Sequence, residues 1–230
     1  MKIRACLLSA SLILTMATTA CSSEASAQGV EAAGISTPMP LPIFVNIPAS
    51  RTLRILTCCD SITVGVDGSS YRDELAALLK PRGIEVVWIV AAVPGTPCTE
   101  WAPKVKDLIV ANRPDILLLN CGTNDVVLSQ AQLRFFATTY AQMINDVRAA
   151  GVKLAVSKLQ ISRVSEQPTL QWLPANEAKI NNVIDRASKF YGDVGLADMS
   201  TIPATPENTT DGVHPSQLGE QQYANAWLAA

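Results

Sequence analysis

The sequence predicts an α/β fold, a three-layer α/β/α sandwich with a five-stranded parallel sheet at its centre. Short apolar segments alternate with segments of helical periodicity from Arg51 onward, which is typical of a parallel sheet with helices on both faces. The segment Ile116–Leu119 is apolar throughout, as expected of a strand that is covered on both faces. The chain from residue 51 to residue 230 is long enough for one domain with a substantial core.

Five segments have the pattern of strands. The first is short and apolar, and the second is rich in β-branched residues, which favour extended structure. Each later strand follows a helical segment, so that neighbouring strands run in the same direction. The predicted strands are Leu53–Cys58, Ile84–Val90, Ile116–Leu119, Val152–Ser157 and Val194–Ala197.

The segments between these strands have apolar residues at helical spacing. In the first helix Leu75, Leu78 and Leu79 lie on one face, and Gly151 provides a C-terminal turn for the longest helix. The predicted helices are Tyr71–Arg82, Trp101–Asn112, Ala131–Ala150, Pro174–Phe190 and Gln217–Leu228.

The N-terminus has the three parts of an export signal. Lys2 and Arg4 form a basic flank, residues 5–20 are apolar and uncharged, and Ala25-Ser26-Ala27 is a small-residue cleavage site. The apolar stretch is shorter than the roughly 20 residues of a membrane-spanning helix. We therefore predict a signal peptide at residues 1–27 and a protein that is secreted or held in the cell envelope.

Two further features concern the N-terminal region. Thr18-Thr19-Ala20-Cys21 resembles a bacterial lipoprotein signal, so lipid attachment at Cys21 is an alternative to cleavage after Ala27. Residues 28–50 contain Pro38, Pro40, Pro42 and Pro48, and such a segment is predicted to form an extended tether rather than a helix. The predicted catalytic domain spans residues 51–230.

The charge balance excludes one class of partner. The chain has 18 basic and 20 acidic side chains. Removal of residues 1–27 takes away Lys2, Arg4 and Glu24 and leaves a formal charge of −3. Because no basic cluster stands out, nucleic-acid binding has no electrostatic basis. We expect a neutral substrate and a monomeric protein.

Three short segments carry reactive side chains at the ends of predicted strands or in loops. Ser61 follows the first strand, Asn124 follows the third, and Asp211 precedes His214 by three residues near the C-terminus. His214 is the one histidine of the chain. A serine needs a base to accept its proton during attack, and a carboxylate can orient the imidazole. An Asp-x-x-His turn alone is more often a surface turn, but the three segments together favour a Ser61–His214–Asp211 triad.

These segments resemble, in this order, the motif blocks of the SGNH (GDSL-type) hydrolase family. The resemblance implies a flavodoxin-like sheet, an acyl-enzyme mechanism, and no metal or other cofactor. It also implies an oxyanion hole built from the N–H of Ser61, Gly95 in the turn after the second strand, and the Asn124 amide. An ordinary Pro-Gly turn is the alternative for Gly95. The corresponding Asp60 and Asp125 are implied to bond loop backbone beside the site.

The resemblance extends over most of residues 51–230 and is greatest to the acetylxylan-esterase-like branch. It implies an acetylated sugar or another short-chain ester as substrate, a small molecule or a polysaccharide. The segments that carry it are Ser70-Tyr71-Arg72, Arg113-Pro114-Asp115, Leu196-Ala197-Asp198-Met199, and Asp211-Gly212-Val213-His214-Pro215 with the helix that ends near Trp227.

Four cysteines lie downstream of the predicted signal peptide: Cys58, Cys59, Cys98 and Cys121. In an exported protein these can form disulfides, and four cysteines permit three pairings. Adjacent cysteines seldom pair, so we predict a disulfide between two of Cys59, Cys98 and Cys121, near the proposed site. Buried free thiols are the alternative. A metal site is disfavoured because no C-x-x-C and no nearby histidine are present.

Two other functions remain open at this point. The same residues can hydrolyse lipid esters or thioesters, although few aromatic residues and no long apolar lid are present. A non-catalytic envelope- or carbohydrate-binding module on a decayed hydrolase fold is the second alternative, because Cys59 occupies the position of the family's usual glycine. Nucleotide binding is disfavoured because the chain has neither G-x-G-x-x-G nor a Walker A loop.

Overall fold

A computed structural model of the chain describes residues 43–44, 47–48, 51–65, 69–165 and 167–230. The predicted signal peptide and most of the predicted tether lie outside the described residues, as does Cys21. All of the described residues belong to one compact unit. Among the described residues, no helix combines the length and the apolar character that a membrane crossing requires.

The predicted five-stranded parallel sheet is confirmed. Its strands are β1 (Arg51–Cys59), β2 (Ile84–Ala92), β3 (Ile116–Asn120), β4 (Lys153–Lys158) and β5 (Gly195–Asp198). They lie in the order β2-β1-β3-β4-β5, and each pair of neighbours is parallel. This is the flavodoxin-like order, in which β1 is the point where the chain reverses its direction of winding.

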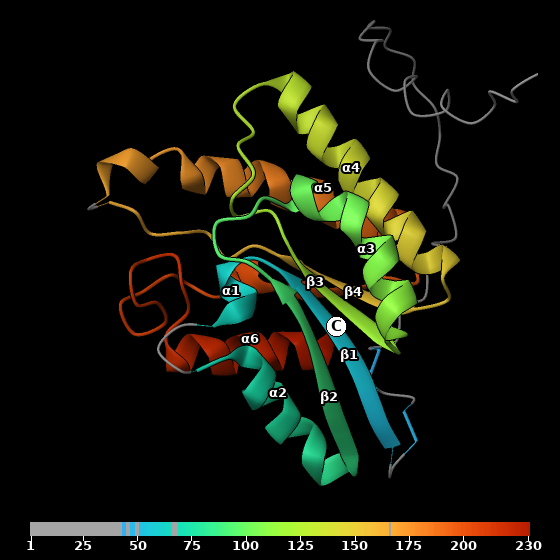
Figure 1. The fold of residues 1–230 in the computed structure, drawn as a ribbon. Helices are drawn as coiled ribbons and strands as arrows, with labels where there is room; N and C mark the ends of the chain where they lie inside the picture. Colours follow the sequence, from blue (N-terminus) through green and yellow to red (C-terminus); the bar gives the residue numbers. More distant parts are fainter. Residues whose placement is uncertain (1–42, 45–46, 49–50, 66–68, 166) are drawn as a thin grey trace, which may run out of the picture. The chain divides into compact units, whose positions relative to one another are not determined.

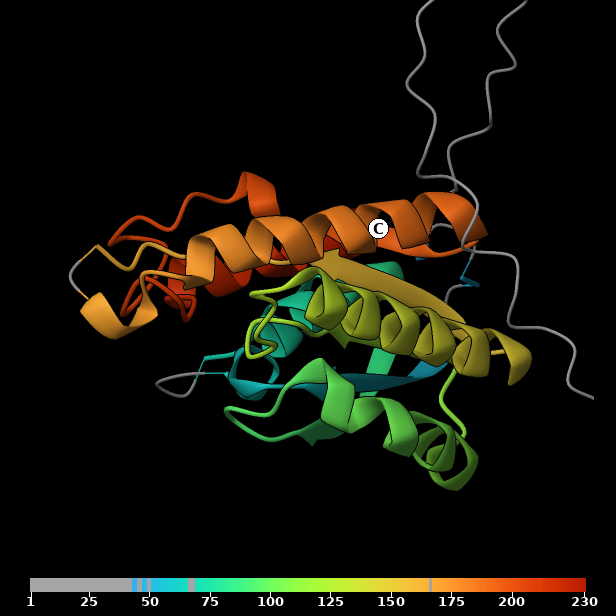
Figure 2. The ribbon, with the colours of Figure 1, turned by 90° about the horizontal axis from the view of Figure 1, so that it is seen from above.

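Helices cover both faces of this sheet (Figure 1, Figure 2). On one face lie α3 (Cys98–Asn112), α4 (Gln130–Ala149) and α5 (Leu173–Tyr191). On the other face lie α2 (Tyr71–Leu79) and α6 (Gln217–Ala229). The three-layer sandwich predicted from the sequence is therefore confirmed.

Each face of the sheet has its own apolar core. The core beneath α3, α4 and α5 includes Val105, Phe136 and Ile184, all at most 5% exposed. The core beneath α2 and α6 includes Leu75 and Trp227, both fully buried. The apolar residues at helical spacing thus face the sheet, as their periodicity predicts.

Short helical segments replace part of one predicted helix and add to the predicted elements. The first predicted helix ends at Leu79, and Lys80–Arg82 continues as a 3-10 turn, η1, because Pro81 has no N–H to donate. The four-residue helix α1 (Ser61–Val64), directly after β1, was not predicted. Two more 3-10 turns are η2 (Pro168–Leu170) and η3 (Met199–Thr201).

The described residues of the predicted tether contribute to the core, because Ile43 and Ile47 pack against the same apolar cluster as Phe44. Phe44 is 2% exposed and packs in the apolar cluster of α2 and α6. The N–H of Ile43 donates a hydrogen bond of 2.6 Å to the carbonyl of Ala230. Ile43 is thus hydrogen-bonded to the C-terminal residue, Ala230.

Candidate active site

Ser61, Gly95 and Asn124 follow the carboxyl ends of β1, β2 and β3, and Asp211 and His214 lie in the loop between η3 and α6. In a sheet of this order, ligands bind beyond the carboxyl ends of the strands, next to the strand where the winding reverses. Ser61 begins α1 directly after β1, and Asn124 lies in the loop after β3. Strands β1 and β3 are hydrogen-bonded neighbours, so the two loops start side by side.

Ser61, His214 and Asp211 form a continuous chain of hydrogen bonds. The Oγ of Ser61 lies 2.8 Å from Nε2 of His214, although 153 residues separate the two in sequence. The Nδ1 of His214 lies 2.8 Å from Oδ2 of Asp211. The structure therefore brings together the three residues that the sequence motifs proposed as a triad.

Asp211 also shapes the turn that presents His214. Its Oδ1 accepts hydrogen bonds from the backbone N–H of Val213 at 2.9 Å and of His214 at 2.8 Å. The N–H of Thr210 donates to the carbonyl of His214 and closes the same loop. One carboxylate thus holds both the backbone and the imidazole of His214.

The electrostatics of this turn favour one tautomer of His214. Partial burial raises the pKa of Asp211, but the hydrogen bonds from His214 and Val213 outweigh it and hold the pKa below the usual value. The carboxylate is therefore ionised at neutral pH and accepts a hydrogen bond from the N–H at Nδ1 of His214. Nε2 then carries a lone pair toward Ser61, as a general base requires.

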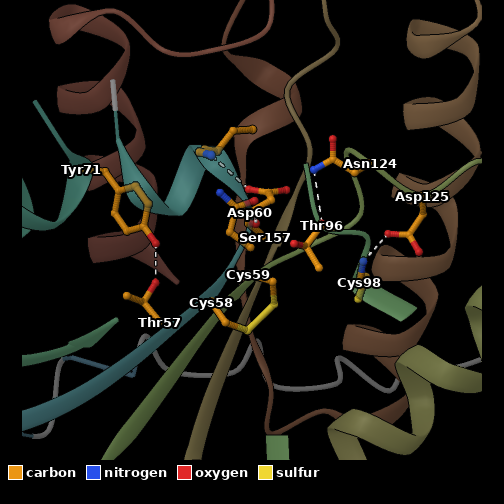
Figure 3. Close-up of a disulfide and its surroundings, with 12 residues drawn as sticks. Thr57, Cys58, Cys59, Asp60, Tyr71, Thr96, Cys98, Asn124, Asp125 and Ser157 are labelled. Carbon is orange, nitrogen blue, oxygen red and sulfur yellow. Dashed lines mark hydrogen bonds between the residues drawn. A yellow bond between two sulfur atoms is a disulfide. The ribbon is translucent and has the colours of Figure 1, made fainter. Parts of the chain in front are cut away.

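Two of the proposed oxyanion donors, Gly95 and Asn124, lie in loops that contact each other (Figure 3). The amide Nδ2 of Asn124 donates a hydrogen bond of 3.3 Å to the carbonyl of Thr96, the residue after Gly95. This bond uses one of the two amide hydrogens, so the second is free to meet an oxyanion. Gly95 has φ +78°, a left-handed conformation that favours glycine.

Replacing Asn124 by alanine is expected to lower kcat for ester hydrolysis by about 100- to 1000-fold with little change in KM. An oxyanion donor stabilises the negative charge that develops in the transition state and contributes little to substrate binding, and Asn124 is proposed as such a donor. Steady-state kinetics on a p-nitrophenyl ester measure both constants. A loss confined to KM would mean that Asn124 binds substrate and does not stabilise the oxyanion.

Asp60 and Asp125 bond loop backbone beside the site, as the resemblance implied. Asp60 is buried, which raises its pKa to about 7, and it accepts from the N–H of Ile62 at 3.1 Å. Asp125 accepts from the N–H groups of Cys98 at 2.6 Å and Thr99 at 3.2 Å. Asp125 thereby satisfies the first turn of α3, so this helix begins at Cys98, before the predicted Trp101.

The predicted pairing of the cysteines is wrong. The structure joins the adjacent Cys58 and Cys59 at the end of β1 (Figure 3), whereas Cys98 and Cys121 are buried free thiols. Burial raises the pKa of both thiols, so they stay protonated. The thiols of Cys98 and Cys121 interact with each other.

Sequence reasoning missed a set of polar residues on α5. Asn176, Glu177 and Asn181 are all buried and bind loop backbone around the site. The available signal was their position, because Asn176 shares the helical stripe of the buried Ile180 and Ile184. A polar residue on a buried stripe requires a partner. Within the described part of the chain, no group of three metal-ligating side chains gathers.

Known solved structures share this fold. A family 3 carbohydrate esterase from Clostridium thermocellum matches with a TM-score of 0.61 and 23% identity, covering 77% of this chain and 94% of that one. A lipase/acylhydrolase from Enterococcus faecalis matches with a TM-score of 0.65 and 20% identity, covering 76% of this chain and 93% of that one. An acetyl xylan esterase from Geobacillus stearothermophilus matches with a TM-score of 0.60 and 18% identity, covering 79% of this chain and 94% of that one.

Sequence comparison identifies the family. A multidomain esterase from Ruminococcus flavefaciens is 25% identical over 240 residues, which cover 86% of this chain and 31% of that protein, so this chain spans about a third of that relative. Residues 60–222 match the GDSL-like lipase/acylhydrolase family, and this stretch runs from the residue before Ser61 past His214. The chain therefore belongs to the GDSL-like lipase/acylhydrolase family, a family of carboxylic ester hydrolases.

Proposed function

We propose that this protein is an exported serine esterase that removes short acyl groups, acetyl above all, from carbohydrate esters. The observation that carries the proposal is the hydrogen-bonded chain Ser61–His214–Asp211, with 2.8 Å at each of its two links. Such a chain makes a serine hydroxyl nucleophilic at neutral pH. The export signal at residues 1–27 is part of the same proposal.

In the acylation step, Ser61 Oγ attacks the carbonyl carbon of the ester, and His214 Nε2 takes the hydroxyl proton. The carbonyl oxygen becomes an oxyanion, which the N–H of Ser61, the N–H of Gly95 and the amide of Asn124 stabilise. The tetrahedral intermediate then collapses. His214 returns the proton to the leaving alcohol, and the acyl group remains on Ser61 as an ester.

In the deacylation step, water replaces the alcohol. His214 takes a proton from the water as it attacks the acyl carbon of the acyl-enzyme. Collapse of the second tetrahedral intermediate releases the carboxylic acid, and His214 returns the proton to Ser61 Oγ. Asp211 stabilises the imidazolium that forms in each step and does not itself become protonated.

The preference for a short acyl group on a sugar is supported by likeness to named proteins. Structures with the same fold include a carbohydrate esterase and acetyl xylan esterases. Aromatic residues make up 5% of the chain, a small supply of the apolar surface that a long acyl chain requires. Because one fold serves many substrates, the substrate itself has to be measured.

A series of p-nitrophenyl esters, from acetate to longer chains, measured beside acetylated xylan, tests this proposal. We expect kcat/KM to be highest for acetate and to fall as the acyl chain lengthens. We also expect acetate release from acetylated xylan by the wild-type protein and none by the Ser61→Ala control.

Two results would contradict the proposal in different ways. A kcat/KM that rises with chain length would assign the same site to lipid esters. No hydrolysis of any ester, together with intact binding to the polysaccharide, would indicate a non-catalytic binding module.

A further inference from the structure

Helix α5 carries three buried amide or carboxylate side chains that bind loops outside the helix. Asn176 and Glu177 are each 1% exposed, and Asn181 is 8% exposed. A buried amide or carboxylate is costly unless its hydrogen bonds are made, and all three bond backbone or side-chain groups of other segments. The function proposed above assigns no role to any of them.

Asn176 holds the loop that carries Asn124. Its Oδ1 accepts from the N–H of Val127 at 2.7 Å, and its Nδ2 donates to the carbonyl of Asp125 at 2.6 Å. The side-chain amide thus makes both bonds that a paired strand would make with this stretch. Asp125 directly follows Asn124, so the clamp fixes the backbone next to the amide donor.

Glu177 acts on a different loop. Its carboxylate accepts from the N–H of Ser162 at 2.7 Å and from the hydroxyl of Ser162 at 2.6 Å. The next residue, Arg163, donates its N–H to the carbonyl of Gly212 at 2.7 Å. Gly212 directly follows Asp211.

The loop of Ser162 and Arg163 packs closely against the turn of Asp211 and Gly212. A Cβ on Gly212 would lie 1.9 Å from the carbonyl oxygen of Arg163, and Gly212 has φ +86°. Only glycine fits this approach. The position of the Asp211 turn therefore depends on the loop that Glu177 holds.

We propose that Asn176 and Glu177 are positioning residues, of which Asn176 sets the oxyanion donor Asn124 and Glu177 sets the Asp211 turn. This inference rests on the proposed function, because it concerns how that site is held in its reactive geometry. A displacement of about 1 Å in a catalytic group can cost on the order of 100-fold in rate. Neighbouring positions on one helix would thus control the two halves of the site separately.

The test is a double-mutant cycle measured on one p-nitrophenyl ester. Asn176→Ala is expected to lower kcat by about 10- to 100-fold and to leave KM within about threefold. In the Asn124→Ala background, the same change is expected to cost less than about threefold. In that background the donor that Asn176 positions is already absent, so the loss of Asn176 has no donor left to displace.

Glu177→Ala is the matched comparison in the same cycle. Its effect on kcat is expected to be the same with and without Asn124→Ala, because it acts through Asp211. Glu177→Gln is expected to restore most of the activity. The glutamine can accept from the N–H of Ser162 and donate to its hydroxyl oxygen.

Asn176→Asp is a second variant in case Asn176→Ala does not fold. It keeps the volume and the acceptor for Val127 but removes the donor to the carbonyl of Asp125. It is expected to lower kcat at least as much as Asn176→Ala, because a carboxylate oxygen then faces the carbonyl oxygen of Asp125, and to show the same non-additivity with Asn124→Ala. Circular dichroism establishes that each variant compared is folded.

Several outcomes would overturn the inference. Full additivity of Asn176→Ala or Asn176→Asp with Asn124→Ala would show a general structural role. A kcat within about twofold of wild type in a folded Asn176→Ala variant would show that the clamp is dispensable. A wild-type protein without esterase activity would overturn the proposed function and this inference together. Activity that depends on Ser61, with an additive cycle, would overturn the inference alone.

Discussion

Ser61→Ala and His214→Ala are each expected to lower kcat by about 10⁵- to 10⁶-fold, the largest effects in this protein. In the proposed mechanism Ser61 supplies the nucleophile, and His214 is the one imidazole of the chain, so no other side chain of that kind can take its proton. Residual hydrolysis is then limited to what binding and the oxyanion donors provide. Steady-state rates on p-nitrophenyl acetate measure the loss.

The same experiment includes a test of cooperation between the two residues. Ser61 and His214 act as a unit across a 2.8 Å hydrogen bond, so the double variant is expected to be no slower than either single variant. Both variants should remain folded, because Ser61 and His214 are not members of either apolar core. A folded Ser61→Ala variant with more than about one-tenth of the wild-type rate would exclude Ser61 as the nucleophile.

Asp211→Asn is expected to lower kcat by about 10⁴-fold while the turn keeps its shape. The oxygen of asparagine can still accept from the N–H groups of Val213 and His214. Its amide N–H would then face Nδ1 of His214 and move the ring proton to Nε2. In that tautomer Nε2 cannot accept the proton of Ser61.

Asp115→Asn is a matched control for this substitution. Asp115 precedes β3 at the end of the strand opposite the site, and it binds Arg51 at 2.6 Å and the N–H of Arg54. Its replacement is expected to leave kcat unchanged. If Asp211→Asn has an effect no larger than that of Asp115→Asn, His214 does not depend on Asp211 for its orientation.

The fold and the proposed triad were accessible from the sequence because their signals are local. The alternation of strands and helices fixes a parallel sheet, and in such a sheet the residues after the strands gather at one edge. Ser61 and Asn124 each lie within a few residues of a strand end, and Asp211 and His214 share one turn. The resemblance to a known family then supplied the pairing of these segments.

The role of the buried polar residues of α5 could not be predicted from the sequence, because it depends on partners that are distant in sequence. Asn176 bonds residues 49 and 51 positions away, and no local pattern marks such contacts. The apolar stripe predicted that α5 faces the sheet, but the polar positions on this stripe were passed over. The cysteines were misassigned for a related reason, since closeness to one site does not determine which thiols pair.

The most direct measurement is peptide mapping by mass spectrometry after reaction with a fluorophosphonate, which forms a covalent bond with an activated serine. We predict one adduct per chain, on the peptide that contains Ser61, with loss of esterase activity in proportion to labelling. We also predict that His214→Ala abolishes the adduct, because the hydroxyl is then no longer activated. An active protein whose adduct lies on another serine, or whose Ser61 stays unlabelled while activity is lost, would contradict the assignment of Ser61 as a nucleophile activated by His214.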